Sequence, residues 1–108
     1  MITPFSIHVD DEVLADLRRR LRHTRWPDEV GSDWQYGTDL TYLKSLCEYW
    51  EREFDWRAQE GALNELEQYR ARIQGAQVHF IHQRSTHDHA LPLLMTHGWP
   101  GSISEFVK

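Results

Sequence analysis

A turn with the composition of an anion-binding site follows a short apolar run, Leu91–Thr96, near the end of the 108-residue chain. The six residues of the turn are His97, Gly98, Trp99, Pro100, Gly101 and Ser102. A proline restricts such a turn and glycines let it bend closely, so its main-chain N–H groups can be held toward developing negative charge. Because open α/β sheets place their chemistry just beyond the carboxyl ends of strands, we expect the functional site here.

A second candidate site comes from four histidines that fall in one predicted strand and the loop after it. They are His79, His82, His87 and His89. Imidazoles at this density could bind zinc or nickel, and the metal could activate water for hydrolysis, for instance of a phosphotriester. The first two are an odd number of residues apart and point to opposite faces of a strand unless it bulges. We therefore favour no metal site, and a metal-assisted hydrolase stays an alternative.

Helical periodicity predicts three helices in the first 68 residues, separated by a loop at 28–38 and a short break near 55. The first helix should run from a cap at Asp10 or Asp11 to about residue 26, with its arginines on a solvated face. The second should cover residues 40–54, and the third should end between residues 64 and 68. We expect the aromatic residues of this region to be core residues, namely Trp34, Trp50 and Trp56.

Alternating periodicity replaces the helical period from Tyr69 onward and predicts a β-hairpin, with strands at 69–73 and 78–80. Residues 4–9 are expected to be extended, and Leu91–Thr96 to form an inner strand. Ser102 or Ser104 should then cap a helix at the end of the chain. An inner strand needs a neighbour on each edge, which the hairpin alone does not supply. The expected fold class is α/β, with a helical segment beside a sheet that is incomplete on its own.

Four strings in the chain resemble one enzyme family. Residues 96–102, Thr-His-Gly-Trp-Pro-Gly-Ser, are similar to the oxyanion loop of microsomal-type epoxide hydrolases, which belong to the α/β-hydrolase superfamily. Residues 24–28, 42–50 and 54–57 are similar to strings in the amino-terminal region of the same family. The resemblance implies that residues 1–68 form its amino-terminal helical meander and that residues 69–108 begin the catalytic domain.

The resemblance also implies a function and site residues. The chain would be the amino-terminal portion of an enzyme that opens epoxides to vicinal diols through an aspartate nucleophile and an ester, with no cofactor. The main-chain N–H of Trp99 would serve the oxyanion hole, in a loop shaped by His97, Gly98 and Pro100, with the histidine in a structural role. The nucleophile elbow Gly-x-Asp-x-Gly does not occur in the 108 residues. We therefore expect this chain alone not to hydrolyse epoxides.

Composition limits the partners. A formal net charge of −5 argues against nucleic acid as a partner, and a single cysteine, Cys47, excludes an intrachain disulfide. The chain shows neither a signal peptide nor an apolar run of membrane-spanning length, so we expect a soluble, cytoplasmic protein. The expected partners are a small apolar epoxide and either a second copy or the missing carboxyl-terminal part of the enzyme. A non-catalytic, self-associating domain rich in aromatic residues is a further alternative.

Overall fold

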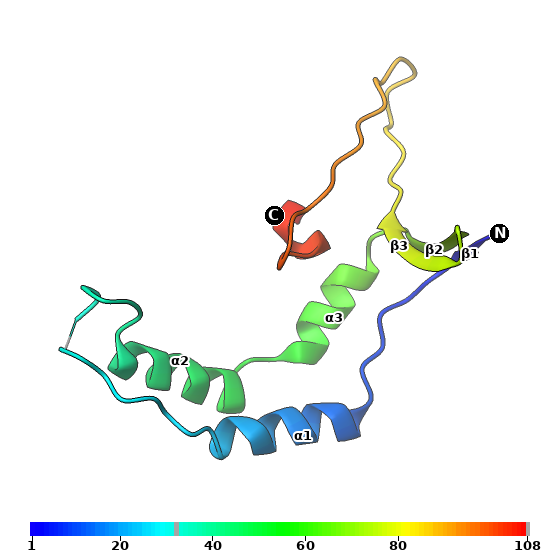
Figure 1. Cartoon of the computed structure of the whole chain (residues 1–108). Coiled ribbons are helices and arrows are strands. Elements are labelled where there is room, and N and C mark those ends of the chain that lie inside the picture. The colour runs from blue at the N-terminus through cyan, green and yellow to red at the C-terminus, as the bar shows by residue number, and fades with distance from the viewer. Residues whose placement is uncertain (32, 108) are drawn as a thin grey trace. The chain divides into compact units, whose positions relative to one another are not determined.

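The computed structural model describes residues 1–31 and 33–107, and the chain divides into two compact units (Figure 1). One unit is Val9–Trp56, and the other combines Met1–His8 with the segment from Arg57 onward. Along the chain the elements are β1 (Ile2–Pro4), α1 (Asp11–Arg22), α2 (Leu40–Arg52), α3 (Trp56–Asn64), β2 (Gln68–Ile73), β3 (Ala76–Ile81) and the 3-10 helix η1 (Ile103–Phe106).

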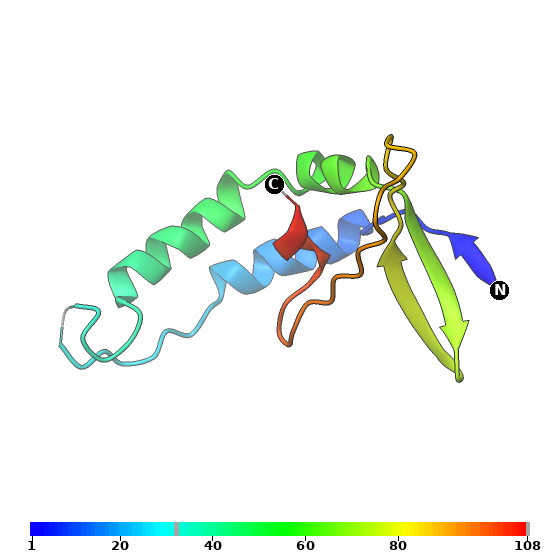
Figure 2. The same cartoon turned by 90° about the horizontal axis from the view of Figure 1, so that it is seen from above.

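Helices α1 and α2 form an antiparallel pair within the first unit (Figure 2). Helix α1 ends at Arg22, four residues before its predicted end. The hydroxyl of Thr24 donates to the main-chain oxygens of Arg20 (3.2 Å) and Leu21 (2.9 Å). These bonds occupy carbonyl groups that the last turn of a helix leaves free, which explains why the helix ends before the apolar pattern does.

Two carboxylates begin α2, because they accept hydrogen bonds from N–H groups that the first turn leaves free. Asp39 accepts from the main-chain nitrogen of Tyr42 (2.7 Å), and Glu29 accepts from that of Leu40 (2.8 Å). The second helix therefore starts where its periodicity predicts.

The arginine-rich face of α1 is exposed, as predicted, and three of its arginines form ion pairs, namely Arg19, Arg20 and Arg22. Asp16 accepts hydrogen bonds from both Arg19 and Arg20, and these guanidinium groups hold the pKa of Asp16 below its ordinary value of 3.8. Arg22 lies 3.3 Å from Glu51 of α2. Ion pairs this exposed contribute little to stability, so the face is a solvated surface.

Strands β1, β2 and β3 form an antiparallel sheet in that order. The predicted hairpin is confirmed, and its two-residue turn has positive φ at Gln74 (48°) and Gly75 (88°), the backbone typical of a type I′ turn. The aromatic rings of Tyr69 and Phe80 stack across the hairpin at 5.7 Å. Strand β1 lies earlier than the predicted extended segment and shares only Pro4 with it; Ile2–Pro4 pairs with β2.

A buried amide connects the sheet to helix α3. Gln68 is 4% exposed, and its Nε2 donates to the main-chain oxygen of Leu63 (2.7 Å) and to Oδ1 of Asn64 (3.3 Å). Its Oε1 accepts from Nε2 of His79 on β3 (2.9 Å). Asn64 in turn bonds both the main-chain nitrogen and the main-chain oxygen of Ile7, each at 2.8 Å. One polar network therefore joins α3, two strands and the segment after β1.

The ring of Phe5 contacts two charged or ionisable side chains of the hairpin. The guanidinium of Arg70 lies 3.8 Å from the ring centroid, and the imidazole of His79 packs edge-on at 5.0 Å. Burial, with a smaller contribution from the positive charge of Arg70, lowers the pKa of His79 from its ordinary value of 6.5.

Few side chains are buried. Within residues 1–31 and 33–107 the buried ones are Ala71, Glu60 and Gln68. The prediction that the aromatic stripe forms a core is wrong for Trp34, which is exposed, and for Trp50, which retains 44% of its surface, whereas Trp56 is half-buried. The two units bury too little apolar surface to enclose their own aromatic residues.

The inner strand expected at Leu91–Thr96 is absent, because these residues have no regular secondary structure. Leu91 is 90% exposed and Leu94 is 89% exposed. In Figure 1 the chain leaves β3 as a long loop and returns to η1 without joining the sheet. A strand apolar on both faces is stable only between neighbours, and the sheet of the described residues supplies none for it.

We predict that replacing His79 with Gln makes the folded chain less sensitive to acid. With a lowered folded-state pKa, the unfolded chain binds more protons as the pH falls through about 6.5. The free energy of unfolding should therefore fall in that range and level off below the folded pKa. Urea unfolding between pH 8 and pH 5 should show a smaller fall for His79→Gln than for the exposed-loop control His89→Gln. Equal falls in both variants would contradict the prediction.

Candidate functional site

The carbonyl oxygen of Gly98 accepts the hydrogen bond that closes the turn after residues 91–96. The main-chain nitrogen of Gly101 donates to it at 2.7 Å, which closes the turn. Nδ1 of His97 lies 3.2 Å from the same oxygen, and because a carbonyl can only accept, this contact requires a proton on Nδ1. The peptide bond between Trp99 and Pro100 is cis. The four predicted loop residues thus lie in one closed turn.

Helix η1 begins directly after the turn and is held by a reciprocal cap. The hydroxyl of Ser102 accepts from the main-chain nitrogen of Ser104 (3.2 Å), and Oε1 of Glu105 accepts from the main-chain nitrogen of Ser102 (3.2 Å). Of the two serines predicted as caps, Ser102 is the residue at the cap position. The helix is a single 3-10 turn of four residues rather than a longer α-helix.

Glycine at position 101 leaves room for a neighbouring side chain. A Cβ atom built on Gly101 would overlap Oε1 of Glu105 and would lie 2.9 Å from the main-chain oxygen of Gly98. At Gly98 a Cβ atom would meet nothing within 4 Å. The carboxylate of Glu105 therefore occupies the volume that any side chain at position 101 would need.

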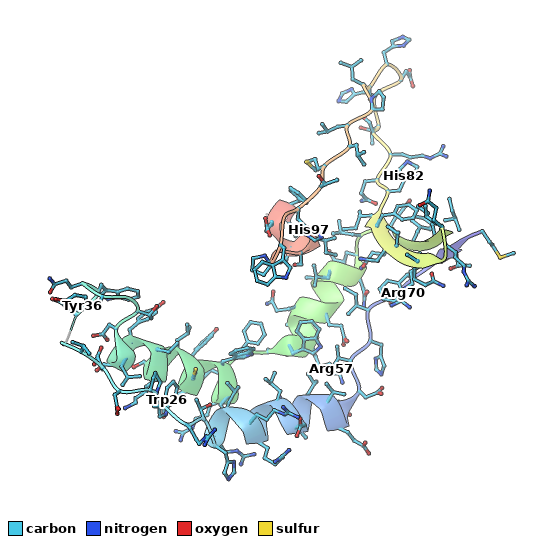
Figure 3. The ribbon with its side chains drawn as sticks, viewed as in Figure 1. Trp26, Tyr36, Arg57, Arg70, His82 and His97 are labelled. Atoms are coloured by element: carbon cyan, nitrogen blue, oxygen red, sulfur yellow. The ribbon has the colours of Figure 1, made fainter. Side chains whose placement is uncertain are left out.

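The turn presents a main-chain donor and a large ring. Within the described residues, the N–H of Trp99 donates to no acceptor, and the Trp99 side chain is 96% exposed. Figure 3 shows His97 beside the η1 ribbon. A closed turn with an unused N–H can bind an oxygen atom that carries negative charge.

The histidines of the alternative hypothesis do not come together. His79 bonds Gln68 inside the sheet, whereas the main-chain nitrogen of His82 bonds Glu67 (3.0 Å) at the end of β3 (Figure 3). His87 and His89 lie in the exposed loop that follows. Among residues 1–31 and 33–107, no three His, Cys, Asp or Glu side chains are placed to hold a metal ion.

An apolar groove of about 620 Å³ lies in the helical unit. Trp56 is one of its lining residues, and the indole Nε1 of Trp56 is buried with no hydrogen-bond partner among the described residues. Other lining residues come from the facing sides of α1 and α2, including Val13, Leu14, Leu17, Leu46, Tyr49 and Trp50.

None of the helices that the structure describes is long and apolar enough to cross a membrane.

Comparison with known proteins decides the family. The model of the family described as epoxide hydrolase N terminus matches residues 2–106. The chain belongs to this family. A homologue from Stigmatella aurantiaca is 51% identical over 108 residues, and epoxide hydrolase 1 of Sus scrofa is 40% identical over 112 residues. Both alignments cover 99% of this chain but only 24% and 25% of those proteins, so the chain spans about a quarter of their length.

The solved structure of Aspergillus niger epoxide hydrolase is similar in fold to the described chain. The TM-score is 0.86 at 34% sequence identity, over 98% of this chain and 29% of that one. The similarity confirms the predicted fold class: the three helices and three-stranded antiparallel sheet match the amino-terminal region of α/β-hydrolase epoxide hydrolases, with an incomplete sheet.

Sequence reasoning missed the part that Glu105 plays at the turn. The signal was present, because residues 102–105 read Ser-Ile-Ser-Glu, and serine followed three residues later by glutamate is the pattern of a capping box. The contact of this glutamate with Gly101 could not be predicted, because it depends on how the turn folds back over the helix.

We predict that Gly101→Ala loosens the turn and that Gly98→Ala does not. The new methyl group at position 101 must displace the Glu105 carboxylate, whereas at position 98 it meets open space. Hydrogen exchange of the Ser102 amide, which bonds that carboxylate, should become several-fold faster in the first variant only. The same exchange rate in both variants would refute the steric argument.

Proposed function

We propose that this chain is the amino-terminal part of an epoxide hydrolase that converts epoxides to vicinal diols, and that Trp99 supplies a main-chain donor to the reaction. The observation that carries the proposal is the closed turn at His97–Gly101 with its unused N–H, in a chain whose match to the epoxide hydrolase N terminus covers residues 2–106. The relatives and the solved structures that bear the name epoxide hydrolase support the substrate class.

The turn would act in the hydrolytic half of the reaction. A carboxylate nucleophile from elsewhere in the enzyme attacks one epoxide carbon, the carbon–oxygen bond breaks, and the ring oxygen leaves as an alkoxide that takes a proton. Water then gives a proton to a base elsewhere in the enzyme and attacks the carbonyl carbon of the resulting ester, and the carbonyl oxygen becomes negatively charged. The Trp99 N–H would stabilise this oxygen, and one such donor contributes about 2.7–4 kcal/mol to catalysis. Collapse of this intermediate releases the diol and restores the carboxylate.

The exposed apolar surfaces support a second part of the proposal. Leu91, Leu93 and Leu94 expose at least 80% of their surface, and the helical unit carries a large apolar groove. Each fully buried leucine contributes about 1.5–3 kcal/mol, so covering these surfaces would be strongly favourable. We propose that further polypeptide of the same enzyme covers both, and that residues 91–96 then form the inner strand.

We predict that Trp99→Pro abolishes most of the activity of a full-length epoxide hydrolase that carries this chain as its amino-terminal segment. Proline has no N–H, so the donor is lost, and kcat for diol formation should fall about 10²–10³-fold. Trp99→Phe is the matched control, because it changes the ring and keeps the N–H; its kcat should stay within about tenfold. Equal losses in the two variants would assign the effect to the ring, and an inactive unmodified enzyme would refute epoxide hydrolysis itself.

We also predict that residues 91–96 acquire backbone protection in the full-length protein. The amides of residues 91 and 93–96 should exchange at least about 100-fold more slowly there than in the isolated 108-residue chain, because the hydrogen bonds of a strand form only when a neighbouring strand is present. The measurement is made at two protein concentrations. Protection that rises with concentration in the isolated chain would favour self-association instead.

A further inference from the structure

We propose that Glu105 is a positioning residue for ester hydrolysis: its carboxylate, seated over Gly101 and bonded to the Ser102 N–H, holds the turn that aims the Trp99 N–H at the oxyanion. The inference rests on the proposed function of that N–H. It adds a side chain that never touches the substrate to a site otherwise built from main chain.

The argument starts from the peptide group between Gly98 and Trp99. A trans peptide group is planar, so its carbonyl oxygen and its N–H point in opposite directions. The oxygen of Gly98 is bonded to the main-chain nitrogen of Gly101 at 2.7 Å, within the turn. Fixing that oxygen therefore fixes the direction of the Trp99 N–H, which points away from the turn's closing bond.

The next step is what keeps Gly101 in place. On its carboxyl-terminal side, the main-chain nitrogen of Ser102 donates to Oε1 of Glu105 at 3.2 Å. The same carboxylate occupies the place that a Cβ atom at position 101 would take, with Cδ 2.6 Å from that point. Glu105 thus holds the last peptide group of the turn by a hydrogen bond and covers its outer side by contact.

The role requires an acceptor oxygen at position 105 and does not require a negative charge. Glutamine keeps an acceptor oxygen at the same reach and also serves in capping boxes, whereas alanine removes the acceptor and leaves the Ser102 N–H without its partner. A charge would even oppose the developing oxyanion, because like charges repel. Comparing Glu105→Gln with Glu105→Ala therefore separates positioning from acid–base or charge effects.

The experiment uses the full-length epoxide hydrolase that carries this chain and measures kcat and KM for diol formation. Glu105→Ala should lower kcat about tenfold or more and lower KM in proportion, with kcat/KM within about twofold, because the misaimed donor slows only ester hydrolysis, which follows capture of the epoxide. Glu105→Gln should restore kcat to within about threefold of the unmodified enzyme. Gly101→Ala, which displaces the carboxylate and also crowds the main-chain oxygen of Gly98, should lose at least as much kcat as Glu105→Ala.

The nitrogen chemical shift and exchange rate of the Trp99 amide give a readout that is independent of turnover. Both should change in Glu105→Ala and be preserved in Glu105→Gln. The inference is overturned if Glu105→Ala lowers only the melting temperature, or if Glu105→Gln loses as much kcat as Glu105→Ala. If the unmodified enzyme has no activity, only the proposed function is refuted, and the amide measurements then decide whether Glu105 positions the turn. If Glu105→Ala does not fold, Gly101→Ala takes its place in the comparison with Glu105→Gln.

Discussion

The buried amide of Gln68 is the interaction on which the sheet-bearing unit depends. A single primary amide both donates to the end of α3 and accepts from His79 on β3, while its own backbone belongs to the middle strand. With so few buried apolar side chains, the order of this unit comes largely from such polar contacts. Each buried donor or acceptor left unpaired costs about 1–3 kcal/mol, so the network holds one arrangement against alternatives.

Local periodicity was enough to predict the helices and strands that form from contacts between residues near one another in the sequence. The three helices follow from apolar spacing, and the hairpin follows from alternation around a turn that Gly75 permits. Their ends were less predictable: the carboxyl end of α1 depends on one hydroxyl, that of Thr24. Leu91–Thr96 has the composition of an inner strand, but forming a strand requires partners, and composition does not say whether partners are present.

The candidate site was predictable in position and only partly in construction. The glycines and the proline of the turn identify a place where the main chain can approach a ligand. Which carbonyl closes the turn, and which side chain covers it, are properties of the folded geometry. Closeness in the sequence did not predict closeness in space for the histidines. His79 is hydrogen-bonded within the sheet, whereas His87 lies in an exposed loop.

The shared volume at positions 101 and 105 limits the order in which these residues can change during evolution. A side chain at 101 needs the Glu105 carboxylate to move, so this substitution should cost less after a change at 105 than before it. The contact with the Gly98 oxygen adds a further requirement that the backbone shift. Glycine at 101 should therefore persist in a lineage for as long as the glutamate does, whatever substrate the enzyme comes to accept.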